Sequence, residues 1–218
     1  MYIFNHFNTN FKFKQDLSTP ILEGFKMEDI QELLHISRIE DSLKRIRRTG
    51  WQKGFIVHSE TVAEHLHHTA IVSIYLMKVL DLEIDWEKVL LLSLTHDMAE
   101  AYIGDIPYPE KTDEDREMEN KYLRDIYKVL GLEDLVDEVD KRETIEHLIY
   151  KFSELTATYL QGIIYLSKGF RDQYIHEIVT NMLDRLESIA IKLKNEKLSD
   201  LLEDMKKLYQ LYLDDASK

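Results

Sequence analysis

The chain has 218 residues, of which 44% are hydrophobic and 32% are charged, and it contains no cysteine. This composition is typical of one well-packed globular domain, and it excludes disulfides and thiolate metal sites. The net charge of −13 argues against general binding to nucleic acid or anionic membranes, because both need a basic face. No apolar run reaches membrane-spanning length, and no basic stretch followed by an apolar core opens the sequence, so we expect a cytoplasmic protein.

The first part of the chain divides into an extension and a helix. Residues 1–26 are aromatic and polar without a clear period, and we interpret them as an N-terminal extension of a single domain that spans residues 27–218. From Met27 to Ile46 the apolar residues fall at helical spacing, which predicts the first helix.

A basic stretch follows this helix. Between Ser42 and Ser59 there are five lysines or arginines and no acidic residue. One interpretation is that these cations stabilise the C-terminus of the helix through its dipole. The other is an anion-binding pocket with Trp51 as an aromatic wall. The charge pattern alone favours the first.

The next helix is predicted to begin at Thr61, because Thr61 and Glu64 match a capping box. His65, His67 and His68 crowd its first turns. Residues two and three positions apart on a helix cannot all face one way. We therefore expect His65 and His68 to share a face and His67 to be solvated.

The stretch from residue 89 to 109 reads as a buried apolar helix with polar residues in its second half. Asp85 or a neighbour is expected to cap this helix at its start. His96 and Glu100 are four residues apart, which would place them on one helix face, and Asp97 is next to His96. Gly104 offers a helix stop, and Asp105 follows on the turn. Burying these groups is costly unless something such as a divalent cation satisfies them. A satisfied core histidine with a helix-end carboxylate is the alternative.

The remainder is also predicted to be helical. One helix opens with the acidic residues from Asp113 and ends near Gly131, residues 134–169 form one long helix or two, and two amphipathic helices cover residues 171–194 and 196–213. No strand or repeat is evident, so we expect an all-α bundle of about seven or eight helices. Glu154 lies close to the apolar stripe of its helix, where it is either a metal ligand or the ion-pair partner of Lys151.

Four residues on these predicted helices would form a mixed nitrogen and oxygen donor set if they converged: His65, His96, Asp97 and Glu154. Such a set suits Mn, Fe, Co, Ni or Zn better than Mg or Ca. The metal would lower the pKa of a water molecule and polarise a phosphate.

Four further residues could complete a phosphate-cleaving site. Glu100 could shuttle protons, and Asp105 could hold a sugar hydroxyl. Arg48 could neutralise phosphate charge, and Trp51 could stack on a base or sugar.

Four segments in order resemble the motif series of the HD-domain hydrolases: LKRIRRTGW (43–51), ETVAEH (60–65), THDMAEAYIGDIP (95–107) and KFSELTATYLQ (151–161). Their order and spacing are most similar to the 5′-deoxynucleotidase branch, over about residues 35–210. The resemblance implies an all-α HD-domain helical bundle, usually a homodimer. It also implies a metal-dependent phosphomonoesterase that acts on deoxyribonucleoside 5′-monophosphates, with Mn or Co as the favoured metal.

The resemblance assigns roles by position: His65, His96 and Asp97 match metal ligands, Glu100 the catalytic acid/base, Asp105 a substrate-positioning acid, and Trp51 the aromatic residue that crowds the sugar 2′ position. Two departures stand out. The family's last metal ligand is an aspartate, where this chain has Glu154, and the phosphate-binding arginine directly before the tryptophan in some members is Gly50 here, which leaves Arg48 as its substitute.

Two other functions stay open for a chain of this family. The same fold could hydrolyse a nucleoside triphosphate, a ppGpp-like nucleotide or a cyclic nucleotide. The Glu154 departure also fits a degenerate, non-catalytic HD domain that binds nucleotide or serves as a structural dimer.

Overall fold

The computed structural model describes residues 26–107, 110–136 and 144–215, so most of the predicted N-terminal extension lies outside the described residues. The order of elements is α1 (Met27–Leu43), α2 (Thr49–Lys53), α3 (Val62–Leu80), α4 (Trp86–Thr95), α5 (Glu100–Ile103), α6 (Asp113–Leu130), a short 3₁₀ helix η2 (Glu133–Leu135), α8 (Ile145–Ser167), α9 (Gln173–Leu193) and α10 (Glu196–Asp215). The described part of the chain contains no strand, only an isolated antiparallel bridge between Arg47 and Thr61. The expected all-α class is therefore confirmed.

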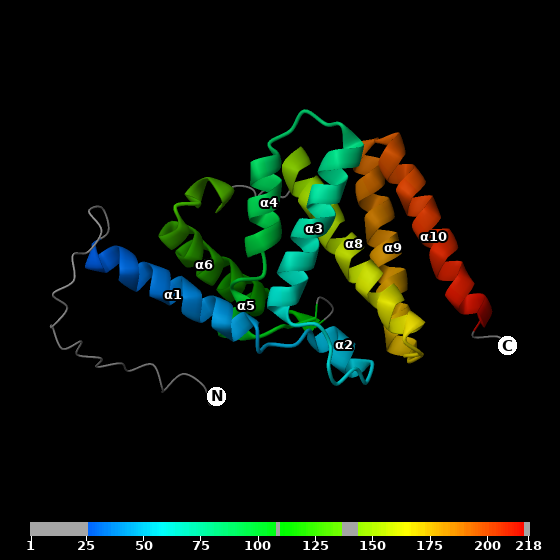
Figure 1. Cartoon of the computed structure of the whole chain (residues 1–218), viewed down its shortest axis with the longest axis horizontal. Helices are drawn as coiled ribbons and strands as arrows, with labels where there is room; N and C mark the ends of the chain where they lie inside the picture. Colours follow the sequence, from blue (N-terminus) through cyan, green and yellow to red (C-terminus); the bar gives the residue numbers. More distant parts are fainter. Residues whose placement is uncertain (1–25, 108–109, 137–143, 216–218) are drawn as a thin grey trace.

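Helix α8 is the centre of the bundle. It packs against α3, α4 and α9, and α10 covers the outer side of α9 (Figure 1). Its predicted apolar stripe is largely buried, and Phe152, Leu155, Tyr159 and Leu166 contribute to the core. On the other side of the molecule, α5 packs against both α1 and α6. Helix α3, which carries His65, and helix α4, which precedes His96 and Asp97, therefore meet beside α8.

Several helix boundaries follow the predicted local signals. The hydroxyl of Thr61 accepts the N–H of Glu64, whose carboxylate in turn accepts the N–H of Thr61, which completes the expected capping box at the start of α3. Asp85 caps α4 through the N–H of Lys88. Helix α6 ends at Gly131, which adopts the left-handed conformation that glycine tolerates best.

Other boundaries were predicted wrongly. The helix expected from residue 89 to a stop at Gly104 is interrupted: it ends at Thr95 and resumes as α5 at Glu100, with a turn between, and α5 then ends before Gly104 as expected. The first helix ends at Leu43, before Ile46, and its first half packs poorly, since Met27 and Leu33 are each 60% exposed. No helix in the described residues is long and apolar enough to cross a membrane.

Candidate metal centre

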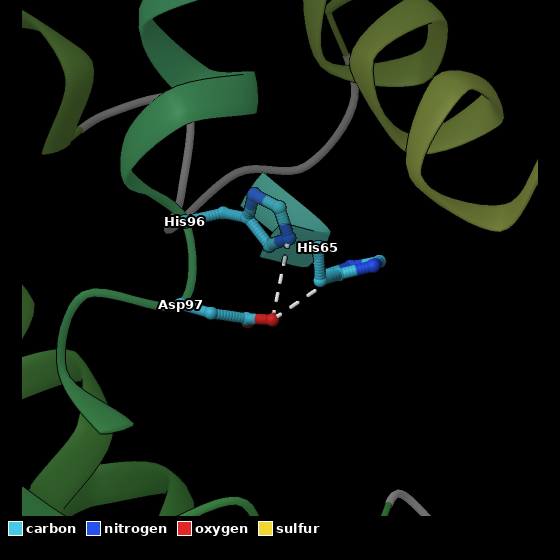
Figure 2. A group of neighbouring side chains, drawn as sticks. All are labelled: His65, His96 and Asp97. Carbon is cyan, nitrogen blue, oxygen red and sulfur yellow. Dashed lines mark ion pairs between the residues drawn. The ribbon is translucent and has the colours of Figure 1, made fainter. Parts of the chain in front are cut away.

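Three of the four predicted metal ligands lie together in the structure. His65 comes from α3, and His96 and Asp97 come from the turn that follows α4 (Figure 2). The Nε2 atoms of His96 and His65 lie 3.4 and 3.9 Å from the same Oδ2 atom of Asp97. One donor atom from each residue lies within 4.8 Å of the others, so the group could hold a metal ion.

The orientation of His96 follows from the end of α4. Its Nδ1 atom lies 3.1 Å from the carbonyl oxygen of Ser93 and 3.2 Å from that of Leu92. Because carbonyl oxygens only accept hydrogen bonds, Nδ1 carries a proton, and Nε2 is the nitrogen that faces Asp97. The break in the helix after Thr95 thus sets which nitrogen is available to a metal.

The buried nitrogens of the two histidines fit a cation. His65 is 0% exposed, and neither of its ring nitrogens has a hydrogen-bond partner among the described residues, nor does Nε2 of His96. Leaving such groups unsatisfied is costly. Burial, assisted by the charge of Arg48, holds the pKa of His65 well below its usual value, so its imidazole is neutral. Neutral imidazoles beside a carboxylate are suitable ligands for a divalent transition metal.

Asp97 supplies the negative charge of this group. Burial opposes its ionised form, but His96, Arg48 and His65 together outweigh burial and hold the pKa of Asp97 well below its usual range. Its carboxylate also accepts a hydrogen bond from Arg48 at 3.0 Å. Asp97 is therefore ionised at neutral pH, as a metal ligand must be.

Glu154 does not join the three-residue group. Its carboxylate pairs with the ammonium group of Lys151, three residues earlier on α8, which is the alternative role that the sequence left open. Burial opposes the ionised form, but Lys151, His96 and Arg185 lower the pKa of Glu154 to about 2. Glu154 therefore carries a full negative charge near His96, and its role as a fourth ligand stays a prediction.

Arg48 connects Asp97 to the neighbouring turn. Its Nη1 atom lies 3.1 Å from Asp105 and 4.0 Å from Glu100. Burial opposes the charged form of Arg48, but these carboxylates outweigh it and raise its pKa. Asp105 is itself fixed, because its carboxylate accepts the N–H of Thr49 at 2.5 Å and its carbonyl accepts the Thr49 hydroxyl at 2.8 Å.

Glu100 is a buried acid beside this network. It is 2% exposed, and its Oε2 atom has no hydrogen-bond partner among the described residues. Burial, followed by the charges of Asp97 and Asp105, raises the pKa of Glu100 well above its usual value. It can therefore keep a proton at neutral pH and deliver it to a bound molecule. The predicted shared helix face with His96 is wrong, because Glu100 begins a new helix.

A cavity of about 630 Å³ opens beside these groups, within the size range of small-molecule sites. The predicted site residues that line it are Arg48, Trp51, His96, Asp97, Glu100, Asp105 and Glu154. Lys111, Lys151 and Arg185 also line it, and they provide cationic groups in an otherwise acidic protein. The sequence shows no signal that distinguishes Lys111 and Arg185 from other surface cations.

Trp51 forms a buried part of the cavity wall. It is 2% exposed, and its indole N–H donates a hydrogen bond to Oε1 of Glu60 at 2.9 Å. Burial raises the pKa of Glu60 to about 7, against the opposing effects of Arg48 and Trp51. Glu60 lies in the ETVAEH segment, but nothing in its spacing indicates a contact with Trp51, so sequence reasoning missed it.

The family model described as an HD domain matches residues 40–212 of this sequence. The chain is similar to the human 5′-deoxynucleotidase HDDC2, with 33% identity over 82 residues, which are 38% of this chain and 39% of that protein. The chain thus spans about two fifths of the length of this relative. The Dictyostelium discoideum protein of the same name is 28% identical over 145 residues, which cover 61% of this chain and 76% of that one.

A conserved hypothetical protein from Pyrococcus furiosus has a similar structure, with a TM-score of 0.68 and 28% sequence identity. The match covers 80% of this chain and 99% of that chain.

Proposed function

The chain belongs to the HD-domain family, and from this premise we propose that it hydrolyses deoxyribonucleoside 5′-monophosphates to a deoxynucleoside and phosphate. Membership in a phosphohydrolase family supports hydrolase activity, and the named relatives support the deoxynucleotide substrate. The observation that carries the proposal is the group of His65, His96 and Asp97 beside a cavity lined by the guanidinium group of Arg48 and the carboxyl group of Glu100.

We propose His65, His96 and Asp97 as ligands of a divalent transition metal, with Mn or Co favoured over Ni, Fe and Zn, and Glu154 as a fourth ligand. When bound, such a metal supplies Lewis acidity and a water molecule of lowered pKa. The two imidazoles and the carboxylate of this chain hold the donor geometry without large rearrangement, because burial and the Nδ1 contacts of His96 restrict them.

The remaining side chains act on the substrate. Arg48 lies at hydrogen-bond distance from Asp97 and Asp105, so a phosphate that enters this position meets a fixed guanidinium. The bond between phosphorus and the 5′ oxygen breaks as a water oxygen bonds to phosphorus. Glu100 donates its proton to the leaving 5′ oxygen, which would otherwise depart as an alkoxide, and the proton lost by the attacking water restores the acid form of Glu100.

Two residues are proposed to contact the sugar. Asp105 is held by Thr49 close to Arg48 and would accept a sugar hydroxyl. Trp51 would occupy the space next to the 2′ carbon, so that a ribose hydroxyl meets its ring. A homodimer and a cytoplasmic location complete the proposal, and both rest on the family resemblance and on composition.

The direct test is phosphate release from dAMP and AMP by the purified protein with Mn or Co. Faster release from dAMP is expected, and no release from any nucleoside monophosphate would count decisively against the proposal. Release of pyrophosphate from a ppGpp-like nucleotide, or of pyrophosphate or triphosphate from a nucleoside triphosphate, would instead select another nucleotide hydrolase of the same fold.

The pairing of Glu154 with Lys151 favours one alternative, a non-catalytic HD domain that binds nucleotide or forms a structural dimer. Metal analysis of the purified protein distinguishes this alternative from the proposed hydrolase. A protein that takes up none of Mn, Co or Ni would support the non-catalytic alternative.

A further inference from the structure

Glu60 is a buried carboxylate to which the proposed chemistry assigns no role, and its Oε1 atom lies 3.9 Å from Nδ1 of the proposed metal ligand His65. It lies in the extended segment before α3, is 8% exposed, and belongs neither to the three-residue metal group nor to the lining of the cavity. Burying a carboxylate costs free energy unless its oxygens have polar partners. The contacts of Glu60 therefore indicate its role.

The contacts of Glu60 reach two residues of the proposed substrate site. Its Oε1 atom accepts the indole N–H of Trp51 at 2.9 Å. Its carbonyl oxygen accepts the backbone N–H of Arg48 at 3.0 Å. Its own N–H donates to the hydroxyl of Tyr165 at 2.8 Å. The backbone of Glu60 thus holds the segment that carries Arg48, and its side chain holds Trp51.

The indole of Trp51 is restrained on its other sides as well. The ring of Tyr165 meets it edge to face, with centroids 5.2 Å apart and planes at 69°. A Cβ atom added to Gly162 would lie 3.3 Å from Cη2 of Trp51 and 2.5 Å from Cγ2 of Val179, so α8 approaches the ring as closely as a glycine permits. Among the described residues, the indole N–H of Trp51 makes one hydrogen bond, the one to Glu60.

We propose that Glu60 is a positioning residue that sets the plane of Trp51 and, through it, the preference for deoxyribose over ribose. The inference rests on the proposed function of the site. A ring that forms a wall excludes one hydroxyl only if it cannot tilt away, and a hydrogen bond from its edge prevents that tilt. The oxygen of Glu60 therefore contributes to specificity without touching the substrate.

Two substitutions at Glu60 separate this role from simple packing. Glu60→Gln keeps an oxygen that can accept the indole N–H, whereas Glu60→Leu has similar size and no acceptor. We expect Glu60→Leu to lower the ratio of kcat/KM for dAMP over AMP about tenfold. Glu60→Gln should keep the ratio within about twofold, because it restores the acceptor. Glu83→Leu, at an exposed glutamate before α4, is the matched control.

A variant on the other side of the hydrogen bond repeats the test if Glu60→Leu does not fold. Trp51→Phe keeps an aromatic ring but removes the N–H donor, and it should also lower the ratio. If Glu60→Leu does fold, its addition to Trp51→Phe should change the ratio by less than about twofold, since the bond is already absent. A folded Glu60→Leu enzyme with the wild-type ratio would overturn the proposal.

Fluorescence tests the position of Trp51 without any activity. The chain has two tryptophans, so Trp86→Phe leaves Trp51 as the only indole emitter. In that background, Glu60→Leu should shift the emission maximum and Glu60→Gln should not. An unshifted emission in Glu60→Leu would refute the positioning role. Failure of the wild-type protein to release phosphate from any nucleotide would instead refute the proposed function.

Discussion

The imidazole rings of His65 and His96 meet edge to face with their centroids 5.5 Å apart, although α3 carries one and the end of α4 carries the other. The Nε2 atoms of the two rings lie 3.9 and 3.4 Å from the same Oδ2 atom of Asp97 (Figure 2). Two buried imidazoles beside an ionised carboxylate form a donor set that suits a divalent transition metal. The first predictions follow from this arrangement.

Substitution of His96 by alanine should remove metal binding. The variant loses one of two imidazole donors, and the remaining donors cannot complete the coordination of a transition metal. After loading with Mn and gel filtration, elemental analysis should find about one ion per wild-type chain and almost none in His96→Ala. His67→Ala, an exposed histidine on α3, is the control and should bind like the wild type. Equal metal content in His96→Ala would exclude this residue as a ligand.

Glu100→Gln should retain metal but lose turnover. The amide has almost the shape of the protonated acid but no proton to give to the leaving oxygen, so kcat should fall by about 10²–10⁴. Metal content and kcat are measured on the same preparation. The exposed Glu117→Gln on α6 controls for the loss of a carboxylate. Wild-type turnover in Glu100→Gln would remove Glu100 from its proposed role.

Trp51→Ala should relax the choice between deoxyribose and ribose. Removing the indole opens space next to the sugar, so kcat/KM for AMP should rise relative to that for dAMP. The change also leaves a core cavity that costs about 3–5 kcal/mol of stability, so the assay belongs well below the melting temperature of the variant. An unchanged substrate ratio in the folded variant would make Trp51 a structural residue only.

Substitutions of Glu154 and of its ion-pair partner Lys151 test whether Glu154 is a metal ligand. If Glu154 ligates the metal, Glu154→Ala should lower metal affinity about tenfold or more, and Glu154→Asp, which restores the family residue, should raise activity. Lys151→Met removes only the ion pair and should leave metal binding close to that of the wild type. Isothermal titration measures the Mn affinity of all three variants, and phosphate release from dAMP measures the activity of Glu154→Asp. If Glu154→Ala binds Mn like the wild type, the ion pair is the whole role of Glu154.

The stability of the metal-free protein should depend on the ionisation of Glu60. Burial raises its pKa from 4.5 to about 7, so between these values the unfolded chain loses the proton first and the folded state is destabilised as pH rises. Above pH 7 the penalty is complete, at about 3 kcal/mol. Glu60→Gln never ionises and keeps the Trp51 hydrogen bond. Relative to the wild type in EDTA, it should gain stability between pH 4.5 and 7 and then stay level. Urea unfolding at several pH values measures the free energy of unfolding of both proteins. A difference between Glu60→Gln and the wild type that does not change with pH would contradict the prediction.

Local signals in the sequence predicted most helix boundaries. Thr61 and Asp85 cap helices as expected, and Gly131 ends one, because these features depend only on a few adjacent residues. The break after Thr95 was not predictable, since the apolar pattern continues through it. The chain leaves the helix where His96 and Asp97 turn toward α3, and a tertiary arrangement of that kind has no period in the sequence.

The candidate site was predictable in its residues but not in its contacts. The motif series indicated His65, His96 and Asp97, which the structure brings together. It contained no indication that Trp51 binds Glu60, because that contact depends on how the segment before α3 packs against α2. The exposed apolar residues in the first half of α1 show the same limit, since helical spacing predicts a helix but not its neighbour.

The hydrogen bonds between Thr49 and Asp105 join positions 56 residues apart, and the chain between them includes α3 and α4. Closing a loop of that length costs entropy that is recovered only when both ends are in place. Refolding from denaturant should therefore restore far-UV helix signal in an earlier phase, and the capacity to bind Mn should return later, at the rate at which this loop closes.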